Sequence, residues 1–534
     1  MISRQSRLIQ YAPHGRDAWS VFGLMLVLHL ATLDVHPILH GDDYIAYLAN
    51  AQALLNHTTY GMPGFLMNTD YAGGADLGQG AYPIGLPLLV LPIVWWAAGS
   101  VPAALGGMAA LNCALVAGFA GLMVRLAQLL AGRVAGILAG LVAGLSPFLF
   151  DQGGFRSPSE PAFLVVFVLT LLADARLAES GRRGDAAWVG ALAAVATLMR
   201  VVGVLLIPAV LLAEALRRRR IGATVLLAGG VAAALAVLGL VAMGQDYFIR
   251  NVAIFASPGH ATVAVHEGMG PRLWQNLRAL PGNLSVFWGY GWGGTAPLTG
   301  VARLGLQLAG LAVLLAGGAG GLISLRRGGV AMAAFAVLQT AMLLVLPLAQ
   351  QSPRYYLPVS VLLLLYVLIA CDAAGRWRGV GLVLAGLAIG VPMAVNWPGV
   401  LAARVADQRY SILEPRMTEL AAWVRSATPA DRVLLSHRPR TLVMLTGRAA
   451  SDFTESRADA GFAALVAATQ ARLLVQMIDA PELVAQAAQS GAPITEASLN
   501  AQADAWEVRF FAPAAPPMVF RNARFRVYTI APPG

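Results

Sequence analysis

Many hydrophobic positions of the chain are gathered into twelve apolar runs, which are separated by more polar segments of different lengths. A membrane-spanning helix needs about 20 predominantly apolar residues, and uninterrupted runs of that kind are typical of membrane spans rather than of soluble amphipathic helices. The pattern therefore predicts an all-α polytopic membrane domain. The runs lie near residues 18–38, 83–99, 104–124, 134–150, 160–175, 186–199, 201–216, 221–243, 303–323, 330–349, 356–371 and 379–396.

Arginine clusters in the linkers predict how the runs cross the membrane, because positively charged linkers stay on the cytoplasmic side. All arginine clusters lie on the cytoplasmic side if the run 83–99 is a re-entrant or interfacial segment rather than a span. This run contains three prolines, which disfavour a continuous helix. The short runs 186–199 and 201–216 are predicted to form a tight hairpin around Arg200. The result is about eleven spans, with the N-terminus inside and the C-terminus outside. The clusters are Arg4/Arg7/Arg16, Arg125/Arg133, Arg176/Arg182/Arg183, Arg217 to Arg220, Arg326/Arg327 and Arg376/Arg378.

A change of composition near residue 398 predicts two domains, a transmembrane domain over 1–398 and a small external α/β domain over 399–534. In the second part an amphipathic helix is predicted over 414–427. Strands are predicted over 432–436, 441–447, 471–477, 506–512 and 524–530. The external loops of the membrane domain are predicted at 39–82, 151–160, 244–302 and 349–355.

Composition agrees with a membrane protein: 58% of the 534 residues are hydrophobic, 12% are charged, and the mean hydropathy is +0.67. A cytosolic enzyme, a disulfide-rich secreted scaffold and a disordered chain are thereby excluded. All 37 basic residues are arginine, so any phosphate must be bound by guanidinium groups. The net charge of +10 is concentrated in the first 400 residues, and we interpret it as an orientation signal rather than as affinity for nucleic acid.

Two adjacent carboxylates, Asp42 and Asp43, follow the first apolar run on the external side. Such a pair can supply a general base and an orienting acid, and a solvated turn that caps the next helix explains it equally well. Glu160 opens a later run from the same side, in the sequence Ser159-Glu160-Pro161. It can face the same cavity as the Asp pair, or Ser159 can simply be the N-cap of the helix.

Two arginines in apolar surroundings, Arg200 and Arg354, are the candidates for binding a lipid phosphate. Their alternative roles are snorkelling to the interface and interfacial anchoring. Trp288 belongs to an aromatic run that either stacks on sugar rings or forms part of an interfacial belt. We predict no cofactor and no standard metal site, with a divalent cation left open. The predicted substrate-binding residues are Arg354, Arg200, Tyr82, Tyr355 and Trp288.

Taken in order, these segments resemble the GT-C superfamily of integral-membrane glycosyltransferases, in particular the bacterial branch related to protein O-mannosyltransferases and lipid A aminoarabinose transferases. The resemblance covers most of residues 15–400. The matching segments are GDDYIAYLANAQALL, AYPIGLPLLVLP, SPSEPAFLVVFVL, ATLMRVVGVLLIPAVLLAEALRRRR and SPRYYLPVSVLLLL.

The resemblance implies an inverting transfer of a sugar from a polyprenyl-phosphate donor to an envelope glycolipid, polysaccharide or protein, outside the bacterial cytoplasmic membrane. The family's first-loop acid corresponds to Asp42 or Asp43, and its second-loop acid corresponds to Glu160. Several relatives carry a lysine where Ala81 and Tyr82 stand here, so the phosphate-binding role passes to an arginine.

Three alternatives remain: a membrane transporter, a non-catalytic lipid-binding protein of envelope assembly, and a GT-C polymerase or ligase with another donor. A transporter predicts inverted repeats and acidic residues near mid-membrane, and the sequence pattern indicates neither.

Overall fold

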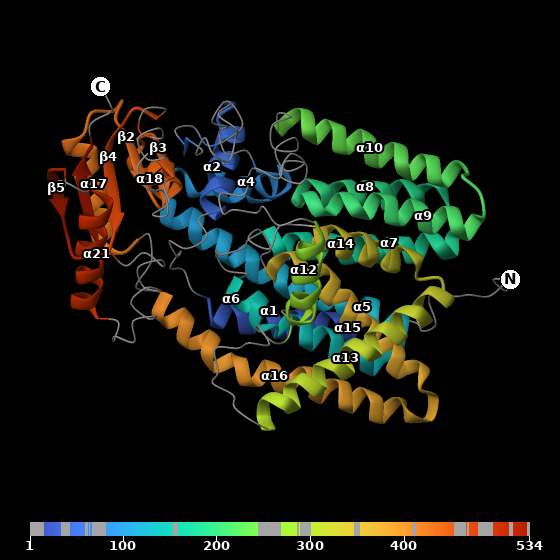
Figure 1. Cartoon of the computed structure of the whole chain (residues 1–534). Coiled ribbons are helices and arrows are strands. Elements are labelled where there is room, and N and C mark those ends of the chain that lie inside the picture. Colours follow the sequence, from blue (N-terminus) through green and yellow to red (C-terminus); the bar gives the residue numbers. More distant parts are fainter. Residues whose placement is uncertain are drawn as a thin grey trace. The chain divides into compact units, whose positions relative to one another are not determined.

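The computed structural model places most of the chain in helices and one small sheet (Figure 1). It divides the chain into two compact units. The membrane unit consists of Met1–Val35 and Pro83–Ala406, and the sheet unit consists of His36–Tyr82 and Asp407–Gly534. The structure describes residues 15–33, 43–58, 62, 65–66, 82–152, 159–243, 269–285, 288, 301–345, 353–407, 413–452, 466, 469–478, 495–511 and 516–530.

The membrane unit is helical, and each predicted apolar run contains helix. Short 3₁₀ turns at Val201–Leu205, Pro353–Tyr356 and Gly375–Trp377 join some of these helices. The helices are α1 (Gly15–Ala31), α4 (Gly85–Ala97), α5 (Val101–Gly144), α6 (Pro147–Gln152), α7 (Ser159–Ser180), α8 (Arg183–Met199), α9 (Leu206–Arg218), α10 (Ala223–Met243), α12 (Met269–Leu284), α13 (Val301–Arg326), α14 (Val330–Val345), α15 (Leu357–Ala373) and α16 (Arg378–Asp407).

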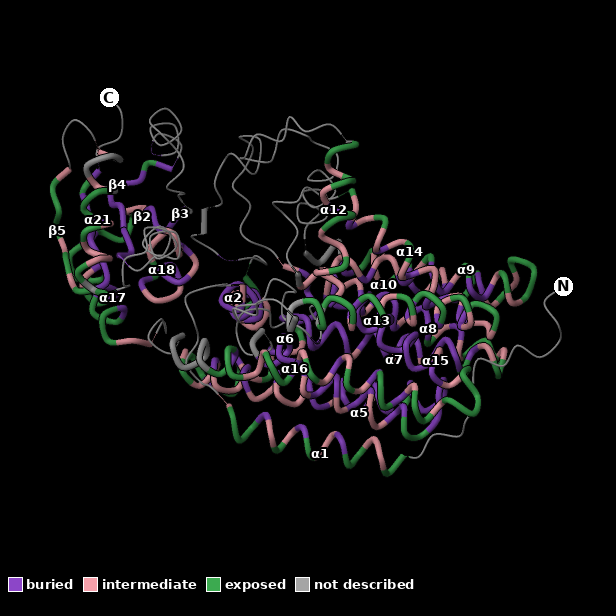
Figure 2. The backbone as a smooth tube through the Cα atoms, turned by 60° about the horizontal axis from the view of Figure 1, so that its bottom comes forward, coloured by how far each residue is buried: buried purple, intermediate pink, exposed green. Residues whose placement is uncertain are grey.

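Two helices form the centre of this unit. The apolar segment that contains α15 has 83% of its residues buried, and the one that contains α7 has 72% buried. The corresponding shares are only 28% for α13 and 22% for α16 (Figure 2). The peripheral helices expose large apolar side chains such as Leu308 and Leu315, which is the surface that a lipid environment requires. The protein is therefore a multi-pass membrane protein.

Five helices in the described part of the chain are long and apolar enough to cross a membrane. They lie within Val101–Phe150, Ser159–Ser180, Gln307–Arg326, Arg354–Ala373 and Gly375–Leu401. Shorter apolar helices occupy Gly85–Ala97, Ala223–Gly239 and Val330–Val345. The count of eleven spans stays a prediction.

The runs 104–124 and 134–150 form a helical hairpin that reverses at Gly132. This glycine has φ +81°, in the left-handed region that glycine tolerates at little cost. The two arms pack closely: a Cβ at Gly136 would lie 2.7 Å from the carbonyl oxygen of Val124, and one at Gly140 would lie 3.0 Å from that of Ala120. Small residues thus permit the close approach of the two arms.

The run 83–99 forms α4, which is a continuous helix in spite of its prolines. Pro83 precedes the helix, and Pro87 lies in its first turn, where backbone N–H groups have no intrahelical partner. Only Pro92 lies in the interior. The expectation that the prolines disfavour a continuous helix is wrong for this reason. At about 20 Å, α4 is shorter than a bilayer core, and its re-entrant placement stays a prediction.

Linkers predicted to be cytoplasmic contact one another in the membrane unit. Arg133 forms an ion pair with Asp17 at the start of α1, with 2.7 Å between Nε and Oδ2. Arg378, at the start of α16, donates from Nη2 to the carbonyl oxygen of Ala131 at 2.6 Å. These contacts place three of the arginine-bearing linkers at the same end of their helices.

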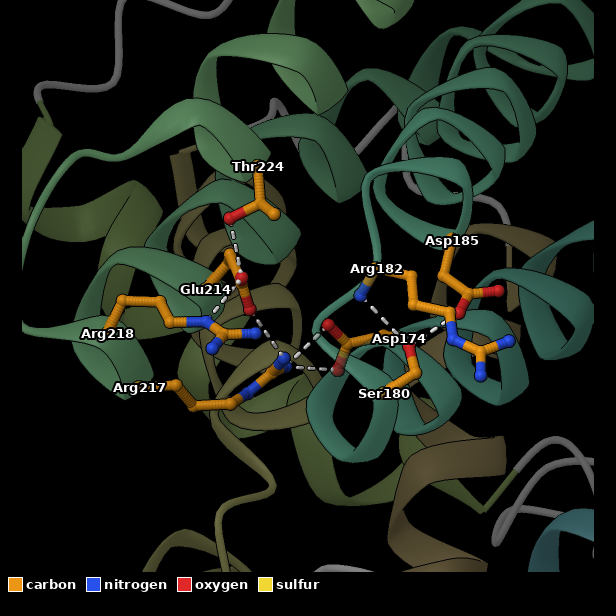
Figure 3. A network of polar contacts seen from close by, with 8 residues as sticks. All are labelled: Asp174, Ser180, Arg182, Asp185, Glu214, Arg217, Arg218 and Thr224. Carbon is orange, nitrogen blue, oxygen red and sulfur yellow. Dashed lines mark hydrogen bonds and ion pairs between the residues drawn. The ribbon is translucent and has the colours of Figure 1, made fainter.

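A second polar network joins α7, α9 and α10 (Figure 3). The buried Asp174 of α7 accepts hydrogen bonds from Arg217 of α9 at 2.5 and 2.6 Å. The buried Glu214 accepts from Arg217, from Arg218 at 3.0 Å and from Thr224 at 2.8 Å. Helices α7, α9 and α10 are thus held together by charge-assisted hydrogen bonds.

The sheet unit contains a six-stranded sheet of order β1-β3-β2-β4-β6-β5. The first four strands in this order run parallel, and β6 and β5 are antiparallel to their neighbours. Its elements are α2 (Asp43–Leu55), β1 (Phe65–Leu66), α17 (Pro415–Ala427), β2 (Val433–Ser436), α18 (Pro439–Thr446), β3 (Ala450–Asp452), β4 (Ala471–Met477), α21 (Glu496–Phe510), β5 (Met518–Arg521) and β6 (Phe525–Thr529).

Most of the predicted elements of this unit are confirmed, and two are wrong. The helix over 414–427 corresponds to α17, and three of the five predicted strands correspond to β2, β4 and β6. The segments 441–447 and 506–512 lie in helices α18 and α21 instead. Pro439 at the start of α18 and Gly447 with φ +67° after its end delimit a helix. A capping box of Thr495 and Ser498 starts α21.

Residues 36–82, which include the segment 39–82 predicted as an external loop of the membrane domain, belong to the sheet unit. Its strand β1 pairs in parallel with β3, in the register Phe65↔Ala450. The compact units therefore divide the chain at residues 35, 82 and 406, whereas the sequence predicts a single boundary at 398.

Candidate active site

Three elements of the membrane unit bring charged side chains together in what we call the arginine pocket, formed by Glu160, Arg200, Arg354 and Tyr355. Glu160 is the second residue of α7. Arg200 directly follows α8 with extended backbone (φ −151°, ψ 138°), and its N–H bonds the carbonyl oxygen of Ala196. Arg354 and Tyr355 lie in the 3₁₀ turn before α15. The local structure thus places each charge at a helix end.

The tight reversal after α8 depends on Gly203. A Cβ at this position would lie 2.3 Å from the carbonyl carbon of Ala196, so only glycine lets the chain fold back here. The reversal leaves Arg200 between two helices, as the sequence predicts.

Glu160 is the anion of the pocket, and it is bound on both oxygens. Arg200 donates from Nη1 to Oε1 of Glu160 and also to Oγ of Ser159 at 2.9 Å. Ser159 donates to Oε2 of Glu160 at 3.1 Å. Arg354 lies farther away, with 3.9 Å between its Nε and Oε1 of Glu160. The exposed fractions of the side chains rise from 2% for Glu160 to 13% for Arg200 and 27% for Arg354.

The two arginines border a small pocket together with Tyr355. The ring centroid of Tyr355 lies 5.7 Å from Cζ of Arg200 and 5.5 Å from Cζ of Arg354, which are cation–π distances. Two guanidinium groups and one carboxylate leave an excess of one positive charge. The more exposed arginine is Arg354, so it is the better placed of the two to meet an anionic ligand.

The sheet unit holds a second cluster, which we call the Asp43 cluster: Asp43, Tyr47, Tyr82 and Arg440. Asp43 is the first residue of α2, where a carboxylate interacts favourably with the helix dipole. The Tyr82 hydroxyl donates to Oδ1 of Asp43 at 2.7 Å, and Arg440 donates from Nη1 to the same oxygen at 3.0 Å. The Asp43 side chain is 19% exposed.

Aromatic contacts fix the donors of this cluster. The Arg440 guanidinium lies 5.4 Å from the centroid of the Tyr82 ring, and Tyr47 packs edge-on against that ring at 4.9 Å. Burial raises the pKa of Tyr82 well above its usual 10.0, the charge of Arg440 opposes that rise, and Asp43 adds to it. Tyr82 is therefore a protonated hydrogen-bond donor at neutral pH.

The structure describes all but one of the residues predicted for the site. Asp42 lies outside the described residues. Trp288 is 3% exposed, so its ring is buried, and its sugar-stacking role stays a prediction. Tyr356, which follows Tyr355 in the chain, is fully buried. Among the described residues, no group of three or more His, Cys, Asp or Glu side chains is placed to hold a metal ion.

Arg440 is not among the residues that the sequence predicts for the site. It lies 397 residues after Asp43, in a segment predicted to precede a strand, and nothing in the local pattern distinguishes it from other arginines. Ser159 was considered only as an N-cap of the helix. Its hydroxyl contacts Glu160 and Arg200, where the sequence suggests an ordinary helix cap.

No protein-family model matches the sequence, and no curated protein matches it. Solved structures do match. An oligosaccharyltransferase from Archaeoglobus fulgidus in the apo form aligns with a TM-score of 0.54 and 13% identity, over 86% of this chain and 70% of that chain. AglB from the same organism, in complex with an inhibitory peptide and a dolichol-phosphate, aligns with a TM-score of 0.51 and 11% identity, over 86% and 69%.

ArnT from Cupriavidus metallidurans, in the apo state, aligns with a TM-score of 0.50 and 15% identity, over 97% of this chain and 98% of that chain. These proteins are membrane glycosyltransferases of the GT-C superfamily. The chain has the GT-C fold, and the resemblance seen in its motifs is confirmed at the level of the fold. The alignment with ArnT extends over nearly the full length of both chains.

Proposed function

We propose that the protein is a glycosyltransferase that moves a sugar from a polyprenyl-phosphate-linked donor to an envelope acceptor on the external face of the cytoplasmic membrane. In this reaction an acceptor hydroxyl attacks the anomeric carbon of the sugar, and the bond from that carbon to the phosphate oxygen breaks. Polyprenyl phosphate leaves with the electron pair, the hydroxyl proton passes to a carboxylate, and the anomeric configuration inverts.

The observation that carries the proposal is the arginine pocket within a GT-C fold. A sugar phosphodiester bears one negative charge, which matches the single excess positive charge of Arg200, Arg354 and Glu160. The leaving phosphate gains a second negative charge as the bond breaks. Guanidinium groups that are already in place stabilise that developing charge without reorganisation. AglB, whose fold this chain shares, was solved with a dolichol-phosphate, which is a lipid phosphate of the same kind.

Glu160 acts in this scheme by orienting the two arginines. Its side chain is almost fully buried and both of its oxygens are occupied by Arg200 and Ser159, which is a poor arrangement for taking up a proton. We assign the proton-accepting or acceptor-orienting role to Asp43, which is more exposed and is held by two donors. Asp42 stays an alternative for this role.

The donor site is tested by titrating polyprenyl phosphate into the detergent-solubilised protein. Arg354→Ala is expected to weaken binding by about 10-fold or more, because a hydrogen bond to a charged group contributes about 1.5–3 kcal/mol. Arg354→Lys is expected to recover only part of the affinity, since lysine cannot form a bidentate contact.

The matched control is Arg376→Ala, which removes an exposed arginine outside the pocket and is expected to bind the lipid as wild type does. Competition with inorganic phosphate separates recognition of the phosphate from recognition of the lipid. Equal affinities of wild type, Arg354→Ala and Arg354→Lys would eliminate Arg354 as a ligand of the donor.

A further inference from the structure

We infer that Arg440, from the C-terminal part of the chain, is a positioning residue that orients the Asp43 carboxylate for its work on the acceptor. The inference rests on the proposed function, because it takes Asp43 to be the carboxylate that meets the acceptor. It gives the C-terminal part of the chain an indirect share in catalysis, through Asp43.

The geometry of the Asp43 cluster defines the orientation. Arg440 and Tyr82 donate to the same oxygen, Oδ1 of Asp43, at 3.0 and 2.7 Å. The Arg440 guanidinium also lies against the Tyr82 ring, so the two donors hold each other in place. Two fixed donors on one oxygen determine the direction in which the carboxylate points.

Arg440 lies on a helix, α18, with defined ends and buried side chains. It is the second residue of α18, which Pro439 starts and Gly447 ends in a left-handed conformation. Leu442 and Thr441 of α18 are buried. A side chain held on such an element keeps its position far better than one on an isolated loop.

Asp43, the ion-pair partner of Arg440, is connected to the same sheet as α18. Asp43 starts α2, and the segment that follows α2 contributes β1, which pairs with β3 directly after α18. Both ends of the Arg440–Asp43 ion pair are thus fixed to one sheet. The pair is only partly exposed, at 17% and 19% for the two side chains, so water competes weakly for it.

The chemical consequence is a loss of turnover, without a loss of donor binding, when Arg440 is removed. A reactive group displaced by about 1 Å can lose about 100-fold in rate. Donor affinity depends on the arginine pocket, which Arg440 does not form. Arg440→Ala is therefore expected to lower kcat by about 10–100-fold and to leave the KM for donor within about twofold.

The assay uses the lipid extract of a deletion strain as donor and its envelope as acceptor, so the sugar need not be identified beforehand. The variants are Arg440→Ala, Arg440→Lys, Asp43→Asn and the double variant of Arg440→Ala with Asp43→Asn. The matched control is Arg448→Ala. Arg448 is a half-buried arginine of the same unit that donates to the carbonyl oxygens of Arg425 and Thr428, and its removal is expected to leave kcat within about twofold.

If Arg440 acts through Asp43, the double variant has the same kcat as Asp43→Asn alone. Arg440→Lys then has a higher kcat than Arg440→Ala. A purely structural role gives independent losses in the double variant and lowers donor binding as well, and that result would overturn the inference. Normal kcat in Arg440→Ala with an inactive Asp43→Asn would overturn it too.

Full activity of Asp43→Asn would instead contradict the role of Asp43 in the proposed function. If Arg440→Ala does not accumulate in folded form, Arg440→Lys decides: wild-type kcat overturns the inference, and a kcat loss at unchanged donor KM supports it.

Discussion

We propose different tasks for two carboxylates, Glu160 and Asp43, because their surroundings differ. Glu160 is 2% exposed and binds Arg200 and Ser159, whereas Asp43 is 19% exposed and has Arg440 and Tyr82 among its partners. A buried carboxylate that is fully engaged holds its partners in place, and an accessible one can meet a substrate. Both were candidates in the sequence because they are charges next to apolar runs. Their different roles depend on contacts that no local pattern records.

The protonation state of Tyr82 leads to a prediction about how the reaction rate depends on pH. Burial raises its pKa above the usual 10.0, so its phenol stays protonated and its hydrogen bond to Asp43 contributes stability at every pH below 10.0. That contribution is lost only as the pH rises through the raised pKa. The pH–rate profile is therefore expected to show no alkaline limb from Tyr82 at any pH below 10.0.

The variant that checks this is Tyr82→Phe, which keeps the ring. Its turnover is expected to be about tenfold lower, with an unchanged profile between about pH 6 and pH 9, because only the hydroxyl donor is lost. Loss of an alkaline limb in Tyr82→Phe would show that Tyr82 titrates in that range, contrary to the prediction.

At the scale of elements, α7 links two polar clusters. Glu160 lies at its start and Asp174 lies fourteen residues later, about 21 Å along the helix. At the far end Asp174 is buried and receives two hydrogen bonds from Arg217 (Figure 3). We interpret this far cluster as the anchor of α7 against α9, which fixes the helix that presents Glu160.

Removing Arg217 tests the anchor. Arg217→Ala leaves the buried carboxylate of Asp174 without this cation, and the loss of one partner of a buried ion pair costs about 3–5 kcal/mol in the free energy of unfolding. Arg220→Ala, at an exposed position a few residues later, is expected to change it by less than about 0.5 kcal/mol. Thermal unfolding in detergent compares the two variants, and equal stabilities would rule out the anchor.

Long apolar elements are predictable from the sequence, and short ones are less so. Each apolar run contains a helix because a run that is buried or in contact with lipid has no water to bind its backbone N–H and C=O groups. A helix pairs these groups within the run itself. The segments 441–447 and 506–512 were misassigned because a short apolar stretch fits a strand and a helix equally well. In both cases the deciding signals lie outside the stretch, in the caps of α18 and α21.

The chain consists of a membrane unit and a sheet unit, and each contains one of the two candidate clusters. The arginine pocket belongs to the first and the Asp43 cluster to the second. The sequence predicts both sets of acidic residues and both arginines of the pocket. It does not predict that residues 36–82 join the C-terminal sheet, because a pairing of two residues in β1 with β3 leaves no periodic signal in the chain.

The proposed function is that this chain transfers a sugar from a polyprenyl-phosphate donor and that Asp43 is needed for the transfer. It is tested most directly by mass spectrometry of the envelope glycans and lipids of the source organism after replacement of its own copy by Asp43→Asn. We expect normal amounts of protein, loss of one sugar from the envelope and accumulation of the matching polyprenyl-phosphate-linked sugar. An unchanged envelope without any accumulated lipid-linked sugar would contradict it.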